Sequence, residues 1–134
     1  QSAQEVFEFR MIIETECARL AARRATVEDI KELKETLERM EECENNRDLK
    51  AFGVADLDFH FKIAKITRNA LVIKTISILQ DVLESSMDDV IGKMGCENGI
   101  FYHKEIIHAI EEKEEVKAAN TMKEHIKKNY EYFK

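Results

Sequence analysis

The stretch ADLDFHFKIA at 55–64 places an acid and an imidazole where a helical pattern calls for apolar side chains. Phe52 and Phe59 are seven residues apart, a spacing that puts both on one face of a helix. The position between them on that face is Asp56, and His60 follows it by four residues. Side chains four residues apart lie over the same turn, so this pair can bind one ion together.

Two more histidines occupy apolar faces further along the chain. His103 lies on the same helical face as Ile100 and Ile107, and His125 lies one turn after Met122. A single buried histidine is usually packed and hydrogen-bonded. A buried acid is different, because an unpaired carboxylate costs several kcal/mol or shifts its pKa until it becomes neutral.

A divalent cation would satisfy all four of these side chains at once. Three neutral imidazoles and one carboxylate suit Zn, Ni, Mn or Fe(II). We therefore predict one divalent ion per chain with Asp56, His60, His103 and His125 as ligands; the alternative is a set of ordinary buried polar groups. A straight helix over 100–133 would separate the last two histidines by ~33 Å. The metal hypothesis thus requires the chain to reverse near 111–115.

Other metal chemistries fit the sequence less well. His108 follows Ile107 by one residue, about 100° around the helix, so we expect it to lie outside the cluster. A di-iron bundle needs paired E-x-x-H motifs, and the chain has one, from Glu105 to His108. A metal hydrolase needs a general base beside the ion, but Asp58 lies about 200° around the helix from Asp56. We predict no catalytic residues and no enzyme.

Composition indicates a helical protein that forms one domain. Of 134 residues, 44 % are hydrophobic and 36 % charged, with four Gly and no Pro or Trp. The net charge of −6 argues against a free-standing nucleic-acid binder. No apolar run approaches ~18 residues, so we expect no membrane span. Three widely spaced cysteines suggest reduced thiols in a cytoplasmic protein.

Apolar periodicity predicts an all-α, antiparallel bundle of about six helices. Thr26 with Asp29 resembles a capping box at the start of the second helix, and Asp48 caps a third that ends near Thr67. Asn69 caps a fourth helix, which is apolar nearly all round and is predicted to be the most enclosed. GKMGCENG at 92–99 is predicted to be a loop.

Four segments of the chain resemble one known family over nearly its whole length. They are FRMIIETECARLAARRATVEDI at 9–30, DLDFHFKIAKITRN at 56–69, HKEIIHAI at 103–110 and AANTMKEHI at 118–126. In these motifs the chain is similar to the FCD domain, the C-terminal ligand-sensing domain of the FadR-like branch of GntR-family bacterial transcription regulators.

The resemblance implies a metal-binding member of that family. The family pattern is D-x3-H followed by two single histidines on separate antiparallel helices, and it falls on Asp56, His60, His103 and His125. If the last two histidines lie on separate antiparallel helices, they are no longer held ~33 Å apart along one straight helix and can share an ion. One departure from the family is the joint between the last two helices, where Gly-Asp is common and this chain has Lys113 and Glu114.

The resemblance also implies a sensor that binds a small organic acid through its carboxylate at the ion. Arg10 matches the family's first-helix arginine and would donate two hydrogen bonds to that carboxylate. An ion pair with Glu14 on the same helix explains the presence of this arginine equally well. Asn69 is a second candidate effector contact, with helix capping as the alternative. We expect a homodimer that binds DNA only through an attached winged-helix domain outside this sequence. A helical interaction module without ligand remains the other hypothesis.

Overall fold

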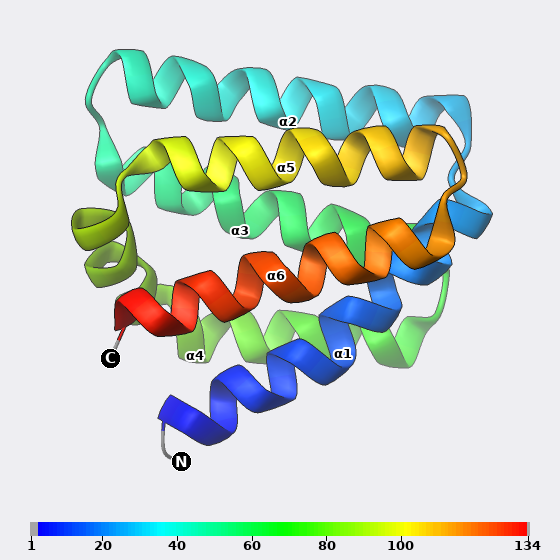
Figure 1. Cartoon of the computed structure of the whole chain (residues 1–134), viewed down its shortest axis with the longest axis horizontal. Coiled ribbons are helices and arrows are strands. Elements are labelled where there is room, and N and C mark those ends of the chain that lie inside the picture. Colours follow the sequence, from blue (N-terminus) through cyan, green and yellow to red (C-terminus); the bar gives the residue numbers. More distant parts are fainter. Residues whose placement is uncertain (1–2, 134) are drawn as a thin grey trace.

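The computed structural model describes residues 3–133, with side chains at 3–84 and 95–132. All regular elements in this part of the chain are helices, as Figure 1 shows: α1 (Ala3–Arg24), α2 (Val27–Asn45), α3 (Leu49–Ile66), α4 (Ala70–Met94), α5 (Cys96–Glu111) and α6 (Glu115–Phe133). The prediction of an all-α bundle of about six helices is confirmed.

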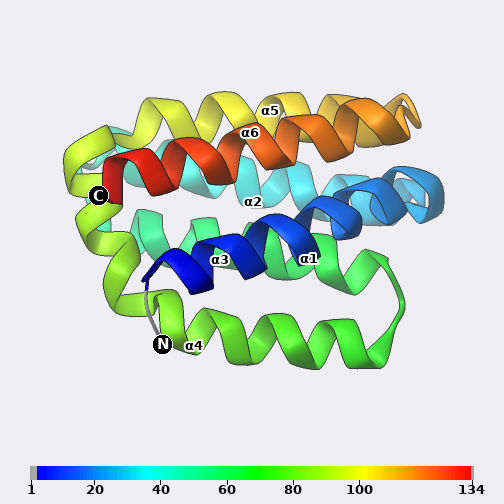
Figure 2. The same ribbon diagram turned by 60° about the horizontal axis from the view of Figure 1, so that its bottom comes forward.

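The helices run alternately up and down one long direction, so sequence neighbours are antiparallel (Figures 1 and 2). The main packed pairs are α1 with α6, α2 with α3, α3 with α4, and α5 with α6. Helix α3 also contacts α1 and α5 and is therefore central. The helix that carries Asp56 and His60 thus packs against the helices that carry Arg10 and His103.

Side-chain caps start two helices where the sequence predicted them. The Thr26 hydroxyl accepts from the Asp29 amide at 3.1 Å, and an Asp29 carboxylate oxygen accepts from the Thr26 amide at 2.9 Å. This is a reciprocal capping box at the start of α2. At α3, an Asp48 carboxylate oxygen accepts from the Ala51 amide at 3.1 Å. These bonds satisfy amides that the helix itself cannot pair.

The chain reverses between α5 and α6 at Lys113, which has a left-handed φ of 57°. Its amide donates to the Ile110 carbonyl at 3.1 Å, and the Glu114 amide donates to the Ala109 carbonyl at 2.8 Å. This pair of bonds is a Schellman motif, a common end for a helix. It folds α6 back along α5 without a glycine, and it brings His103 and His125, which are distant in sequence, close together.

Two predictions about α4 and its surroundings are wrong. No loop occupies 92–99, because α4 continues to Met94 and α5 begins at Cys96, with Gly95 (φ 80°) as the only break. Nor is α4 the most enclosed helix, since it lies at the edge of the bundle (Figure 2). Leu71, Ile78 and Val82 on its outer side are 75 %, 59 % and 48 % exposed.

The cysteines are free thiols, as predicted, and Cys17 and Cys96 are buried. Burial, with help from nearby acids, raises the pKa of Cys17 to about 12 and that of Cys96 to about 11. They therefore behave as small apolar side chains. Among the described residues, no helix is both long enough and apolar enough to cross a bilayer.

Candidate metal centre

The structure brings together the four residues that the sequence singled out as ligands. Asp56 and His60 come from α3, His103 from α5 and His125 from α6. One ligand atom of each lies within 4.8 Å of the corresponding atoms of the other three. All four side chains are buried, with 0–4 % exposure. His108, predicted to lie outside, is exposed on α5.

The three Nε2 atoms form a nearly equilateral triangle. His60 and His125 are 3.2 Å apart at these atoms, and each is 3.3 Å from Nε2 of His103. A ring nitrogen carries one proton or one lone pair, so it cannot bond well to two neighbours at once. The centre of this triangle lies about 1.9 Å from each nitrogen. This distance is close to the ~2.0–2.1 Å of a Zn–N bond. The triangle fits a shared cation.

Asp56 completes the donor set. Its Oδ1 lies 3.1 Å from Nε2 of His103, while its buried Oδ2 has no hydrogen-bond partner. Burial alone would raise the pKa of this carboxyl, but the neighbouring imidazoles, His103 foremost, hold it well below its usual range. An ionised carboxylate with an unused oxygen is a good ligand for a divalent ion, so the residues present fit a metal.

Glu14 on α1 orients the first histidine. His60 Nδ1 donates to Glu14 Oε1, which leaves the Nε2 lone pair facing the cluster. Glu14 Oε2 accepts from Arg10 Nε at 2.6 Å. Burial opposes ionisation of Glu14, but Arg10 and His60 outweigh it and hold its pKa at about 2. Sequence reasoning named Glu14 only as a partner for Arg10; its place on the buried face of α1 was the available signal.

The other two imidazoles are held in the neutral form that binds metals. The His103 ring stacks on Phe59, with centroids 3.8 Å apart, and its Nδ1 lies 3.1 Å from the Met40 sulfur. Burial lowers the pKa of His103, although Asp56 opposes this. Burial and the two neighbouring imidazoles hold the pKa of His125 well below its ordinary value. Neither ring needs to lose a proton near pH 7 before it binds an ion.

Arg10 is buried beside the cluster. The helical pair with Glu14 forms, yet its Nη1 has no hydrogen-bond partner. The guanidinium carbon lies 5.5 Å from the ring centroid of Phe7. Its positive charge also contributes to the lowered pKa of His125. One donor of a buried guanidinium is thus left for an anion.

Asn69 is not brought to this group. Its side-chain oxygen accepts from the Leu71 and Val72 amides at 3.0 and 3.2 Å, so it caps α4. It is exposed and lies nine residues beyond His60, which corresponds to ~13 Å along a helix. Capping accounts for this residue. Asp58 pairs with charged neighbours on the far side of α3.

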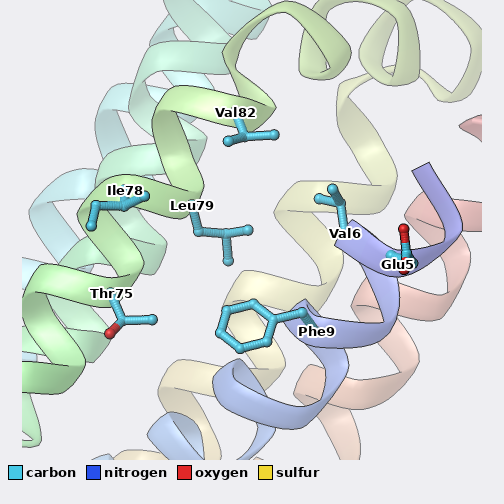
Figure 3. A pocket seen from close by; sticks show the side chains of 7 residues that line it. All are labelled: Glu5, Val6, Phe9, Thr75, Ile78, Leu79 and Val82. Carbon is cyan, nitrogen blue, oxygen red and sulfur yellow. The ribbon is translucent and has the colours of Figure 1, made fainter. Parts of the chain in front are cut away.

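A second concave feature lies apart from the cluster, in a groove between α1 and α4 (Figure 3). Its volume is about 440 Å³, and no cluster residue lines it. The lining is largely apolar: Glu5, Val6, Phe9, Thr75, Ile78, Leu79 and Val82. In Figure 3, Phe9 and Leu79 project into the space between the two helices.

Residues 5–128 match the FCD domain, which accounts for nearly all of the sequence. The chain belongs to the FCD domain family. The resemblance inferred from its motifs is therefore confirmed. The chain is 31 % identical over 130 residues to the Uxu operon regulator of Haemophilus influenzae. That match covers 91 % of this chain and 47 % of the regulator, so the chain spans about half of its length.

Solved structures give the same result for the fold. Streptococcus agalactiae GntR superposes with a TM-score of 0.82 at 26 % identity, over 92 % of this chain and 56 % of that one. McbR/YncC of E. coli superposes with a TM-score of 0.86 over 97 % of this FCD domain and 66 % of that chain. Its identity is 16 %, so this second likeness concerns the fold alone.

Proposed function

We propose that this FCD domain senses a small organic acid at a buried divalent metal and thereby controls DNA binding by a GntR-type transcription regulator. The observation that carries this proposal is the buried cluster of one aspartate and three histidines, whose donor atoms meet within 4.8 Å. Membership of the FCD family and the likeness to an operon regulator support the regulatory role.

Asp56, His60, His103 and His125 would hold the ion. This donor set suits Zn, Ni or Mn. Once bound, such an ion supplies positive charge and an open coordination position for a carboxylate oxygen. Glu14 keeps the His60 ring in the tautomer that presents Nε2, and Phe59, which is fully buried and stacks on His103, keeps water from that side of the cluster.

Buried charge supports an anionic effector. Among the described residues, the buried charged side chains other than histidine are Arg10, Glu14 and Asp56, one cation and two anions. With neutral imidazoles, a divalent ion turns this excess of one negative charge into an excess of one positive charge. Because unbalanced buried charge is costly, a monoanionic carboxylate would be favoured beside the free Nη1 of Arg10.

The site is built to influence several helices at once. Its donors lie on α3, α5 and α6, and Arg10 and Glu14 lie on α1. An acid bound among them would tie these four helices together, and a change in their packing is what an attached domain would respond to. We propose that DNA is bound only by a winged-helix domain outside this sequence, in a regulator that acts in the cytoplasm.

We also propose that the domain forms a homodimer through the groove between α1 and α4. The outer sides of these helices expose Phe9, Ile12 and Ile78, which are the kind of side chain that an interface covers. A two-fold axis would place this surface against its own copy, so every contact would occur twice.

Metal analysis and thermal unfolding test the sensor function. We expect about one divalent ion per purified chain, by elemental analysis. A panel of carboxylic acids should contain members that raise the Tm of the loaded domain and leave the EDTA-treated domain unchanged, because binding stabilises only a state that has the site. A domain that holds no ion and responds to no acid would instead be a helical interaction module.

A further inference from the structure

The three imidazoles of the cluster differ in what their Nδ1 atoms face. His60 donates from Nδ1 to the buried carboxylate of Glu14. His103 Nδ1 lies 3.1 Å from the sulfur of Met40, and His125 Nδ1 has no hydrogen-bond partner within the described part of the chain. A histidine that binds a metal through Nε2 carries its proton on Nδ1, where a carboxylate, a carbonyl or a water usually accepts it. A thioether in that place is unusual.

Met40 reaches the cluster from α2, a helix that carries none of the four proposed ligands. Its side chain is fully buried, and α2 packs against both α3 and α5. The His103 ring lies almost flat on the Phe59 ring, with 9° between the two planes. This stack fixes the plane of the imidazole, and the Met40 sulfur lies at its Nδ1 edge. The contact is therefore well defined from two sides.

The two nitrogens of His103 compete for one proton. Nε2 lies 3.1 Å from Asp56 Oδ1, and Nδ1 lies 3.1 Å from the Met40 sulfur. A neutral imidazole holds a single proton, and a carboxylate oxygen is a much stronger acceptor than a thioether sulfur. Without an ion, the proton is therefore favoured on Nε2, where it blocks the lone pair that a metal needs. His60 has the opposite arrangement, because its carboxylate partner lies at Nδ1.

We propose that Met40 is a positioning residue that limits how tightly the cluster holds its ion, because its weak acceptor leaves His103 in a tautomer that must change before a metal binds. This inference rests on the proposed function. The change moves one proton from Nε2 to Nδ1 of the same ring and leaves the charge of the ring unaltered. A stronger acceptor at Met40 would favour the change, and an alkyl group would oppose it.

A different role for Met40 is only to fill space beside the ring. Any replacement would then weaken metal binding, through poorer packing or through a polar group buried without a partner. The two roles differ in sign for a replacement of similar size that accepts a hydrogen bond more strongly. That difference makes the proposal testable.

Two replacements of similar shape separate the roles. Met40→Gln brings a carbonyl oxygen to Nδ1 and should tighten Zn²⁺ binding roughly tenfold, whereas Met40→Leu removes the acceptor and should weaken it roughly tenfold. Competition with a chelator measures both affinities on the folded domain. Met11→Leu is the matched control, because it removes a half-buried thioether on α1. It should bind Zn²⁺ as the wild type does.

Nuclear magnetic resonance of the ring nitrogens follows the tautomer itself. In the metal-free wild-type domain, His103 should carry its proton mainly on Nε2, and Met40→Gln should move the proton toward Nδ1. The zinc-loaded domain should show the proton on Nδ1 in the wild type and in both variants. A residue that only fills space would leave the tautomer of the metal-free ring unchanged.

Weaker Zn²⁺ binding in both Met40 variants, or wild-type affinity in both, overturns the inference. If Met40→Gln does not fold, the wild-type spectrum decides, since a metal-free His103 protonated on Nδ1 also overturns it. In these cases, Zn²⁺ bound by the wild type leaves the proposed sensor function standing. A wild-type domain that binds no divalent ion overturns both.

Discussion

The metal cluster and the α1–α4 groove are opposite departures from a simple apolar core. In the cluster, polar side chains lie inside the protein with too few partners; in the groove, apolar side chains such as Ile78 face solvent. Buried polar groups and exposed apolar patches are the informative exceptions to burial statistics. The first exception calls for an ion and an acid, and the second calls for another protein surface.

Helix α1 contributes to both regions with different faces. Arg10 and Glu14 face inward to the cluster, while Phe9, about 100° around the helix from Arg10, lines the groove. The two regions are thus close in sequence and distinct in chemistry. If they are independent, a change in one should leave the other intact, and the predictions below use that separation.

The largest effect is expected for His60→Ala. The variant removes one nitrogen of the Nε2 triangle and breaks the bond between His60 and Glu14, which then keeps only Arg10 as a buried partner. We expect bound metal to fall from about one ion per chain to none, measured by elemental analysis. The matched control is His108→Ala on the exposed side of α5, which should keep the ion. Metal lost from the control, or kept by His60→Ala, would refute the ligand assignment.

Glu14→Gln should weaken the cluster without removing a ligand. The amide keeps the shape of the carboxylate but loses the charge that orients His60 and pairs with Arg10. Loss of such a supporting group costs roughly 10–100-fold in metal affinity. Competition with a chelator measures this. Glu16→Gln, which changes an exposed pair with Arg19, is the control and should have wild-type affinity.

Ile78→Glu tests the other region. A charge in the apolar groove should convert the proposed dimer to a monomer in sedimentation experiments, because burying an unpaired carboxylate is unfavourable. Bound metal should not change. Val116→Glu places the same charge on α6, away from the groove, and should remain dimeric. If both variants are dimers, the groove is not the contact surface.

Without metal, the domain should lose stability as the pH falls below about 6.5. Burial lowers the pKa of His103 and His125 in the folded state below the ordinary value of 6.5. The unfolded chain therefore takes up protons first, so stability is complete above this pH and declines below it. The Tm of EDTA-treated protein should fall between pH 7 and pH 5. A flat profile would contradict buried, neutral imidazoles.

The smallest effect is expected at the turn that brings α6 beside α5. Lys113 has a left-handed φ of 57°, where glycine carries no steric cost. Lys113→Gly should stabilise the domain by up to about 1 kcal/mol, measured by denaturant unfolding. Metal affinity should be unchanged, because the turn already holds the histidines together. A loss of affinity would mean that the lysine itself tunes the cluster.

Much of the fold was predictable because local rules and periodicity agreed. Thr26 and Asp48 start helices as their side chains dictate, and inward faces selected all four candidate ligands. Errors arose where composition was taken as a sign of local structure. Gly99 lies inside α5, and a Cβ added there would make only an ordinary contact with the Phe52 ring, so this glycine does not mark a loop. The exposed side of α4 carries apolar residues. From the sequence alone, such residues cannot be distinguished from buried ones.

The sequence by itself determined which side chains share a helical face, since that depends on a repeat of 3.6 residues. It therefore determined that Asp56, His60, His103 and His125 point inward. Only the tertiary structure decided that they meet, because the reversal at Lys113 has no strong local signal. It also decided that Glu14 orients His60, since this contact depends on α1 packing against α3, a helix distant in sequence.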